Sequence, residues 1–224
     1  KLHTYKFVDD IYIDENGNET GRLKVVLSFM GKNGKELAYM ECKKTEFIPE
    51  GRHYTYEGTV TTDDFISVIE ITKGGKNKYE LDKETGMLRL DRVLYTATHY
   101  PANYGFIPRT YAKDNDPLDV LVLCSEQIQP MSIVECYPIG VITMLDNGAP
   151  DDKIISIPFN DPTYNTYKDI SQLPAHVFDE MKHFFSVYKT LEEKETAIDE
   201  VRGVLDAVSI IEDAIVAYNK KFAK

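Results

Sequence analysis

The sequence has no tryptophan, few cysteines, no long apolar run and too few basic residues to balance its acidic ones. The chain carries 26 Lys and Arg against 37 Asp and Glu, a formal net charge of -11 at pH 7. Nucleic acids and anionic membranes bind basic surfaces, so this balance excludes an unaided grip on either. Because the chain is so acidic, a partner that carries phosphate groups would need metal ions as bridges. No run approaches the about 18 apolar residues of a membrane-spanning helix.

The three cysteines, Cys42, Cys124 and Cys136, are odd in number and lack the CxxC spacing of redox and metal motifs. Two of them stand in apolar segments with the composition of strands. This usage predicts reduced, buried thiols and a cytoplasmic protein. The N-terminus has no apolar signal core. Because the chain begins at Lys1, the sequence leaves a removed leader open.

The first two thirds of the sequence read as β-structure. With 224 residues, 42% of them hydrophobic, the chain is long enough for one sizeable core. Residues 22–30 and 36–44 alternate apolar and polar around Gly31 and Gly34, which predicts a β-hairpin. Short apolar segments across residues 65–159, separated by Gly, Pro, Asn and Asp, predict the strands of a small barrel.

The last third changes to a helical period. Apolar residues recur at helical spacing over 174–191 and again over 197–222, which predicts two helices. Thr196, with Asp199 three residues later, is expected to cap the second helix. The pattern as a whole predicts an α+β protein, with an N-terminal β-rich extension over 1–62 and the main domain over 63–224.

Three aspartates, Asp114, Asp116 and Asp119, stand close together in AKDNDPLDVLVLC, just before an apolar strand. Like charges a few ångströms apart repel by about 4 kcal/mol per pair at an effective dielectric of about 20, so the cluster favours a bound cation. In extended chain Asp114 and Asp116 would project from one face, and a turn at Pro117 would bring Asp119 back toward them. The alternative is a polar turn with solvated acids. A helix-loop-helix calcium site is excluded, because its Gly and Glu positions hold other residues here.

A second acidic group, in MLDNGAPDDK, supplies Asp146, Asp151 and Asp152, again after an apolar strand. Loops at strand ends commonly carry ligand-binding groups on a rigid scaffold, so we expect the two groups to face one cavity. Oxygen ligands without neighbouring histidines select hard ions. The sequence therefore predicts several Mg²⁺ ions, with Mn²⁺ or Ca²⁺ as competitors.

Cationic and phenolic residues accompany these acids. The candidates are Lys78, Arg92, Tyr104, Lys153, Tyr188 and Lys189. Taken one by one, each basic residue is more often a solvated surface charge. Together with metals and carboxylates, the set suits a small, highly charged anion such as a phosphate chain.

Five separated segments carry a family resemblance. They are KYELDKETG followed by LDR, NYGFIP, DNDPLDV, DNGAPDDK and FFSVYKTLE. In their order, spacing and residue identities, these segments resemble those of the family I soluble inorganic pyrophosphatases. The resemblance implies the family fold, a small closed OB-like β-barrel with helices packed outside. It also implies the family reaction, Mg²⁺-dependent hydrolysis of pyrophosphate (diphosphate) to two orthophosphates by in-line attack of a metal-activated water.

The resemblance also implies a role for each candidate. Asp116 matches the general base. The implied metal ligands are Asp114, Asp119, Asp151, Asp146, Glu80 and Glu70. The implied substrate-binding residues are Lys78, Arg92, Tyr104, Lys153, Tyr188 and Lys189. The family often has a further lysine six residues beyond the position of Lys189, where this chain has Glu195 beside Lys194.

The resemblance further implies a homo-oligomer. A hexamer is favoured, with a dimer as the alternative, because the C-terminal region carries His183, Phe184 and Phe185 and lacks the long extension of the dimeric members. For those three residues alone, a core-facing aromatic pair with a surface histidine is equally consistent. Two other functions stay open: a phosphohydrolase acting on polyphosphate or nucleotides, and an inactive metal- or phosphate-binding module on the same fold.

Overall fold

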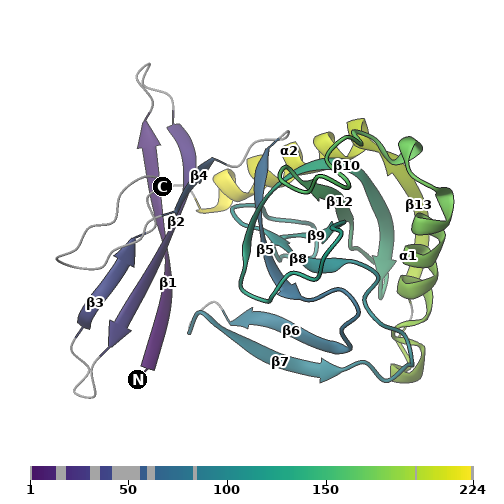
Figure 1. Cartoon of the computed structure of the whole chain (residues 1–224), viewed down its shortest axis with the longest axis horizontal. Coiled ribbons are helices and arrows are strands. Elements are labelled where there is room, and N and C mark those ends of the chain that lie inside the picture. The colour runs from purple at the N-terminus through teal and green to yellow at the C-terminus, as the bar shows by residue number, and fades with distance from the viewer. Residues whose placement is uncertain are drawn as a thin grey trace. The chain divides into compact units, whose positions relative to one another are not determined.

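The structure is a computed structural model (Figure 1). It describes residues 2–13, 19–30, 36–41, 56–59, 64–82, 85–194 and 196–222, the first four ranges as backbone only. The chain forms two compact units, Lys1–Val60 with Glu80–Arg89, and Thr61–Tyr79 with Leu90–Lys224. The domain boundary expected at residue 62 stays a prediction. Cys42 and Glu195 lie outside the described residues.

The N-terminal strands form a four-stranded sheet around β2 (Glu19–Met30). β1 (Leu2–Ile13) pairs antiparallel with the whole length of β2. β3 (Glu36–Glu41) and β4 (Tyr56–Thr59) also pair antiparallel with β2, each with a different part of it. The segments expected to form a hairpin thus fall largely in β2 and β3, and the turn between them lies outside the described residues.

Five strands of the larger unit pair in a closed ring (Figure 1). In ring order they are β5 (Phe65–Ile71), β8 (Asn103–Ile107), β9 (Leu118–Val122), β12 (Lys153–Pro158) and β10 (Ile133–Asp146). β9 and β12 run parallel, and the other pairs are antiparallel. The ring closes because β10 is 14 residues long: its first residues pair with β5 and its later residues with β12.

Four more strands complete the sheets. β13 (Thr196–Gly203) and β11 (Ala149–Pro150) pair with the last part of β10. β6 (Asn77–Asp82) and β7 (Met87–Val93) form a separate two-stranded sheet.

Gly105, in the NYGFIP segment, allows β8 to approach β5 closely. A Cβ atom at this position would lie 1.9 Å from the carbonyl oxygen of Val68. No side chain fits that space, so the glycine is required by the pairing of β5 with β8.

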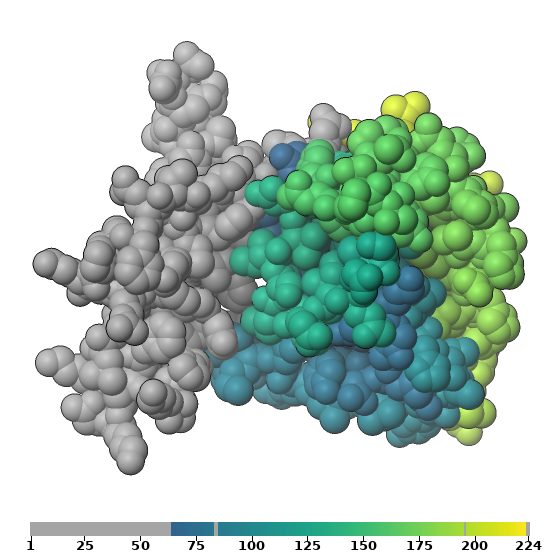
Figure 2. Space-filling view, viewed as in Figure 1, coloured from purple at the N-terminus to yellow at the C-terminus, as the bar shows by residue number. Residues whose placement is uncertain are grey.

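Two helices pack outside the ring. α1 (Ala175–Val187) packs on β13, and α2 (Val204–Phe222) packs on β10 and β13. α1 contributes a row of buried apolar side chains to the core: Phe178, Met181, Phe184 and Phe185. Short 3₁₀ helices, η1 (Ile170–Gln172) and η2 (Thr190–Glu192), flank α1. In the space-filling view, the late residues, green to yellow, cover one side of this unit (Figure 2).

The aromatic pair of α1 belongs to the core and not to an exposed surface. Phe184 is 3% exposed and Phe185 is 1% exposed, whereas His183 is exposed. The pair therefore gives no support to an oligomer interface. No helix in the described part of the chain is long and apolar enough to cross a membrane.

The helix expected from residue 197 is wrong in its first part, because residues 196–203 form β13 and α2 begins at Val204. The free edge at the end of β10 pairs with this segment, and Thr196, Ile198 and Val201 are β-branched, which suits a strand. Thr196 is not an N-cap: its hydroxyl donates to the carbonyl of Phe185 at 2.7 Å. Sheet pairing thus overrides the helical spacing of the apolar residues.

The start of α2 is held by an aspartate from another part of the chain. The carboxylate of Asp169, in the segment before η1, accepts the Val204 N–H at 2.9 Å. A carboxylate at a helix N-terminus satisfies a backbone donor that has no partner inside the helix.

Candidate active site

The loop between β8 and β9 carries Asp114 and Asp116. Thr110 closes the base of this loop, because its hydroxyl donates to the Ile107 carbonyl at 2.5 Å and accepts the Leu118 N–H at 2.8 Å. The base of the loop is therefore fixed to the ends of both strands.

The tip of this loop is a turn and not extended chain. Asn115 has a left-handed backbone with φ of 75°, and the Asp114 carboxylate accepts the Asp116 N–H at 3.1 Å. The expectation that Asp114 and Asp116 project from an extended segment is therefore wrong. Both residues are exposed, while Asp119 is half-buried in β9.

Lys153 is the centre of the site. It lies in β12 directly opposite Asp119 of β9, and its side chain is buried. The Lys153 ammonium donates to Asp119 at 2.7 Å, to Asp151 at 2.7 Å and to the Tyr104 hydroxyl at 3.3 Å. Tyr104, on β8, donates its own hydroxyl proton to Asp119. Three predicted site residues, from β8, β9 and the segment just before β12, thus meet at the ammonium of a fourth, Lys153.

Burial and mutual charge set the protonation states of this cluster. Burial raises the pKa of Asp119, and the Asp151 carboxylate adds to the rise, while the Lys153 ammonium opposes both. Burial lowers the pKa of Lys153, but the Asp119 and Asp151 carboxylates outweigh it and raise that pKa well above its ordinary value. Burial, with the charge of Asp119, also raises the pKa of Tyr104. Lys153 therefore stays charged at neutral pH, and Tyr104 stays a neutral donor.

Asp114 is influenced by the same cluster. Although Asp114 is exposed, partial desolvation by the surrounding protein raises its pKa, and the charges of Asp119, Asp151 and Asp116 add to the rise against the backbone hydrogen bond from Asp116. The exposed loop is thus close enough to Asp119 and Asp151 for their charges to repel. The predicted convergence of the carboxylates on one metal site stays a prediction.

Lys189 and Asp146 form a second pair. The Lys189 ammonium, just after α1, donates to the Asp146 carboxylate at the end of β10 at 2.5 Å. Tyr188 is buried beside it, and burial raises the pKa of its phenol, with further influence from Lys153, Asp151 and Asp146. The charges of both clusters therefore act on Tyr188.

Arg92, on β7, is held by two acids. Its Nε donates to the Glu192 carboxylate of η2 at 2.9 Å, and its Nη1 pairs with Asp91. Asp91 also pairs with Lys78 of β6 at 3.4 Å. Burial lowers the pKa of Arg92, but Glu192 and Asp91 outweigh it and raise that pKa. Among the residues that the structure describes, the buried Nη2 of Arg92 has no hydrogen-bond partner.

The two predicted glutamate ligands differ in position. Glu70, 9% exposed, lies on β5 at a β-bulge, where Ile69 pairs with Gly105 and Ile71 with Tyr104. Bulges commonly redirect a side chain beside an active site. Glu80 is an exposed residue of β6 and belongs to the unit that contains the N-terminal strands.

No three carboxylate, thiol or imidazole side chains within the described ranges already stand in an arrangement that would hold a metal ion. Asp119 and Asp151 already share a positive counter-charge, because the Lys153 ammonium bridges their carboxylates. The assignment of metal ligands stays a prediction.

Two acids of the site were not predicted from the sequence: Asp91 and Glu192. Asp91 stands next to Arg92 in LDRV, so adjacency to a candidate cation was an available signal. Glu192 is 100 residues away from Arg92 in the chain, and an exposed-looking glutamate in KTLEEKE carries no local signal of such a contact.

Comparisons with known proteins match most of the chain. The family model described as inorganic pyrophosphatase matches residues 67–219. Soluble inorganic pyrophosphatase 2 of Chlamydomonas reinhardtii is 48% identical over 159 residues, which cover 70% of this chain and 83% of that protein. Soluble inorganic pyrophosphatase PPA1 of Solanum tuberosum is 48% identical over 154 residues, 69% of this chain and 73% of that protein.

A solved structure extends the agreement to the fold. The inorganic pyrophosphatase from Helicobacter pylori superposes with a TM-score of 0.69 and 41% sequence identity, covering 79% of this chain and 99% of that one. The family match runs from β5 into α2 and so includes every predicted site residue, from Glu70 to Lys189. This chain belongs to the inorganic pyrophosphatase family.

Proposed function

We propose that this chain is an inorganic diphosphatase that hydrolyses pyrophosphate to two orthophosphates. The observation that carries the proposal is the buried Lys153, which contacts Asp119, Asp151 and Tyr104 from within the sheet. A site that combines several carboxylates with fixed cations suits metal ions and a polyanion together. Surface acids in a solvated turn would not need a buried ammonium at their centre.

The chemistry of the donor set fits hard divalent cations. Every proposed ligand is a carboxylate: Asp114, Asp119, Asp151, Asp146, Glu70 and Glu80. The raised pKa values of Asp114 and Asp119 reflect desolvation together with the charges of neighbouring acids, and a cation would relieve that repulsion. Oxygen ligands select Mg²⁺, with Mn²⁺ as a substitute. When bound, such ions neutralise phosphoryl oxygens and lower the pKa of the attacking water.

The proton of the attacking water goes to Asp116. Its carboxylate lies in the exposed loop beside Asp114 and is open to solvent. Water attacks one phosphorus in line, the bridging P–O bond breaks, and the Asp116 carboxylate accepts the proton.

The cations and phenols stabilise the charge that develops on the two phosphates. The buried Nη2 of Arg92 is a donor for a phosphate oxygen. Lys189 and Lys78 supply further positive charge, and the Tyr104 and Tyr188 hydroxyls stay protonated because burial raises their pKa values. Groups fixed before the reaction stabilise such charge without reorganising.

Phosphate release tests the proposal most directly. We would compare pyrophosphate, tripolyphosphate and ATP under excess Mg²⁺, before and after exhaustive chelation with EDTA. We expect pyrophosphate to be hydrolysed far faster than the others, activity to vanish in EDTA and return with Mg²⁺, and Ca²⁺ to support little turnover. Preference for tripolyphosphate or ATP would indicate a broader phosphohydrolase, and no release from any substrate would indicate an inactive binding module.

Three finer features belong to the same proposal. The closed ring of five strands with helices outside supports an OB-like barrel. A cytoplasmic location is supported by the free thiols of Cys124 and Cys136. A homo-oligomer, with a hexamer favoured over a dimer, rests on the family resemblance, and light scattering at micromolar concentration distinguishes these states from a monomer.

A further inference from the structure

Tyr111 joins the loop that carries Asp114 and Asp116 to helix α2. Its backbone N–H donates to the carbonyl of Ala214, in the middle of α2, at 2.9 Å. Its ring lies under the last turn of the same helix. The Lys221 ammonium is 3.8 Å from the ring centroid, and the Phe222 ring meets it edge-on at 5.6 Å between centroids.

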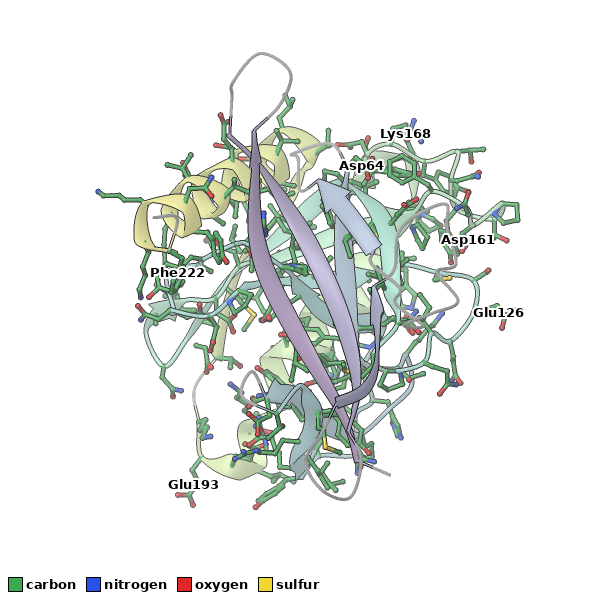
Figure 3. The ribbon with its side chains drawn as sticks, turned by 90° about the vertical axis from the view of Figure 1, so that its left-hand side faces the viewer. Asp64, Glu126, Asp161, Lys168, Glu193 and Phe222 are labelled. Atoms are coloured by element: carbon green, nitrogen blue, oxygen red, sulfur yellow. The ribbon has the colours of Figure 1, made fainter. Side chains whose placement is uncertain are left out.

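The last turn of α2 thus covers the loop from outside. Phe222 is labelled at the end of α2 in Figure 3, and Lys221 also donates to the Tyr111 hydroxyl. Cation–π and edge-on aromatic contacts of this kind contribute about 0.5–1.5 kcal/mol each. They are modest contacts, but they act together on the loop between β8 and β9.

Inside the loop, Tyr111 acts on the residue between the two aspartates. The Tyr111 hydroxyl donates to the side-chain carbonyl of Asn115. Asn115 has a left-handed backbone, and its N–H donates to the Ala112 carbonyl at 3.1 Å. The rotation of Asn115 sets the directions in which Asp114 and Asp116 leave the turn, so the phenol holds the turn in one conformation.

We propose that Tyr111 is a positioning residue that holds Asp114 and Asp116 in their metal-binding and proton-accepting orientation by tying their loop to the last turn of α2. The inference rests on the proposed function, in which these carboxylates bind metal and accept the proton. A loop that is ordered before the metal arrives avoids the entropy cost of ordering on binding, so its loss weakens metal affinity.

A purely structural role would have different consequences. Phe222 is 50% exposed, Lys221 is exposed and Tyr111 is half-buried, so these contacts add little apolar burial to the fold. The hydrophobic core of the larger unit lies elsewhere, among buried residues such as Tyr100, Leu121 and Ile142. Removing the Tyr111 hydroxyl should therefore alter metal affinity much more than global stability.

The test compares Tyr111→Phe, which removes the hydroxyl and keeps the ring, with Lys221→Met, which removes the ammonium. Tyr164→Phe, in the loop after β12, is the matched control. Mg²⁺ binding is measured by calorimetry without substrate, alongside the Mg²⁺ dependence of the rate, KM for pyrophosphate and thermal unfolding in EDTA. For Tyr111→Phe we expect the Kd for Mg²⁺ to rise about tenfold, the usual effect of losing a group that orients a ligand. KM at saturating Mg²⁺ and the unfolding midpoint should stay near wild type.

Two results would overturn the proposal. One is a Kd for Mg²⁺ in Tyr111→Phe equal to that of Tyr164→Phe. The other is a lower unfolding midpoint with an unchanged Kd, which would assign Tyr111 a structural role alone. Because calorimetry needs no turnover, the comparison stands even if the wild type releases no phosphate from pyrophosphate, a result that would contradict the proposed function separately.

Discussion

Lys153 of β12 and Asp119 of β9 stand opposite each other in the parallel pairing of these strands, with ammonium and carboxylate 2.7 Å apart. Both residues are placed by the register of the sheet and not by a flexible loop. The sheet register therefore fixes the position of this cation relative to this acid. The loops with Asp114 and Asp151 add further acids to this fixed pair.

Replacing Lys153 by Met should destabilise the metal-free protein. The substitution keeps the length of the side chain and leaves Asp119 and Asp151 with no buried counter-charge. Breaking a buried pair in this way costs about 3–5 kcal/mol, so we expect the free energy of unfolding by urea in EDTA to fall by about that amount. Mg²⁺ should restore part of the loss, because the acids then regain a cation.

Lys182→Met is the matched control for this prediction. Lys182 pairs with Asp179 at 2.7 Å on the exposed face of α1, and exposed pairs of this kind contribute about 1 kcal/mol or less. A loss for Lys153→Met no greater than that for Lys182→Met would show that the buried ammonium is not the counter-charge of the site.

Asp116 and Asp119 should respond differently to substitution by Asn. If Asp116 accepts the proton, Asp116→Asn lowers kcat by roughly 10²- to 10⁴-fold and leaves Mg²⁺ affinity near wild type. If Asp119 is a metal ligand, Asp119→Asn raises the Mg²⁺ concentration needed for half-maximal rate, and extra Mg²⁺ recovers part of the loss. Initial rates titrated with Mg²⁺ check both. The same shifted metal dependence in both variants would make Asp116 a ligand, and two unchanged variants would support the solvated turn.

The residues of the central cluster could be predicted because their signals are local. Asp114, Asp116 and Asp119 stand in one short segment, and Asp151 and Lys153 in another, each at the end of an apolar strand. The sequence could not provide the register between β9 and β12, which decides that Lys153 faces Asp119. Sheet pairing is a nonlocal property, and no spacing within either segment encodes it.

β13 shows the same limit for the fold. Ile198 and Val201 fit helical spacing with the apolar residues of α2, so the pattern alone favours one long helix. Their strand conformation follows from the edge that β10 presents after its pairing with β5 ends. Charge pairs such as that of Arg92 and Glu192 were missed for a similar reason, because only the folded chain brings them together.

Glu192→Gln should weaken substrate binding through Arg92. The Glu192 carboxylate holds Nε of Arg92 at 2.9 Å, and only 6% of the Glu192 side chain is exposed. An amide cannot match the charge-assisted bond, so the guanidinium loses its fixed direction. We expect kcat/KM for pyrophosphate to fall by about tenfold, equivalent to about 1.4 kcal/mol. Glu193→Gln, next in the chain and exposed, is the control, and equal effects of both substitutions would argue against a role in holding Arg92.

Asp161 should make stability depend on pH in the acid range. Asp161 (Figure 3) is buried, and its carboxylate accepts the Ser125 N–H at 2.7 Å and the Thr163 N–H at 2.9 Å. Burial raises its pKa, but these donors outweigh burial and hold the pKa below 3.8. Because the folded pKa is lower than the unfolded one, the stabilisation is fully present above pH 3.8 and is lost as the pH falls through the folded pKa.

Asp161→Asn tests this directly, since the amide keeps one acceptor and cannot titrate. At about pH 7 we expect the free energy of unfolding to be about 1–3 kcal/mol lower than in the wild type, because two backbone donors lose a charged acceptor. Urea unfolding repeated from about pH 7 to about pH 3 should show this difference shrink below pH 3.8. Asp213→Asn, on the exposed face of α2, is the matched control. A wild-type advantage that stays constant to the lowest pH would mean that packing, and not the charge of Asp161, stabilises the loop after β12.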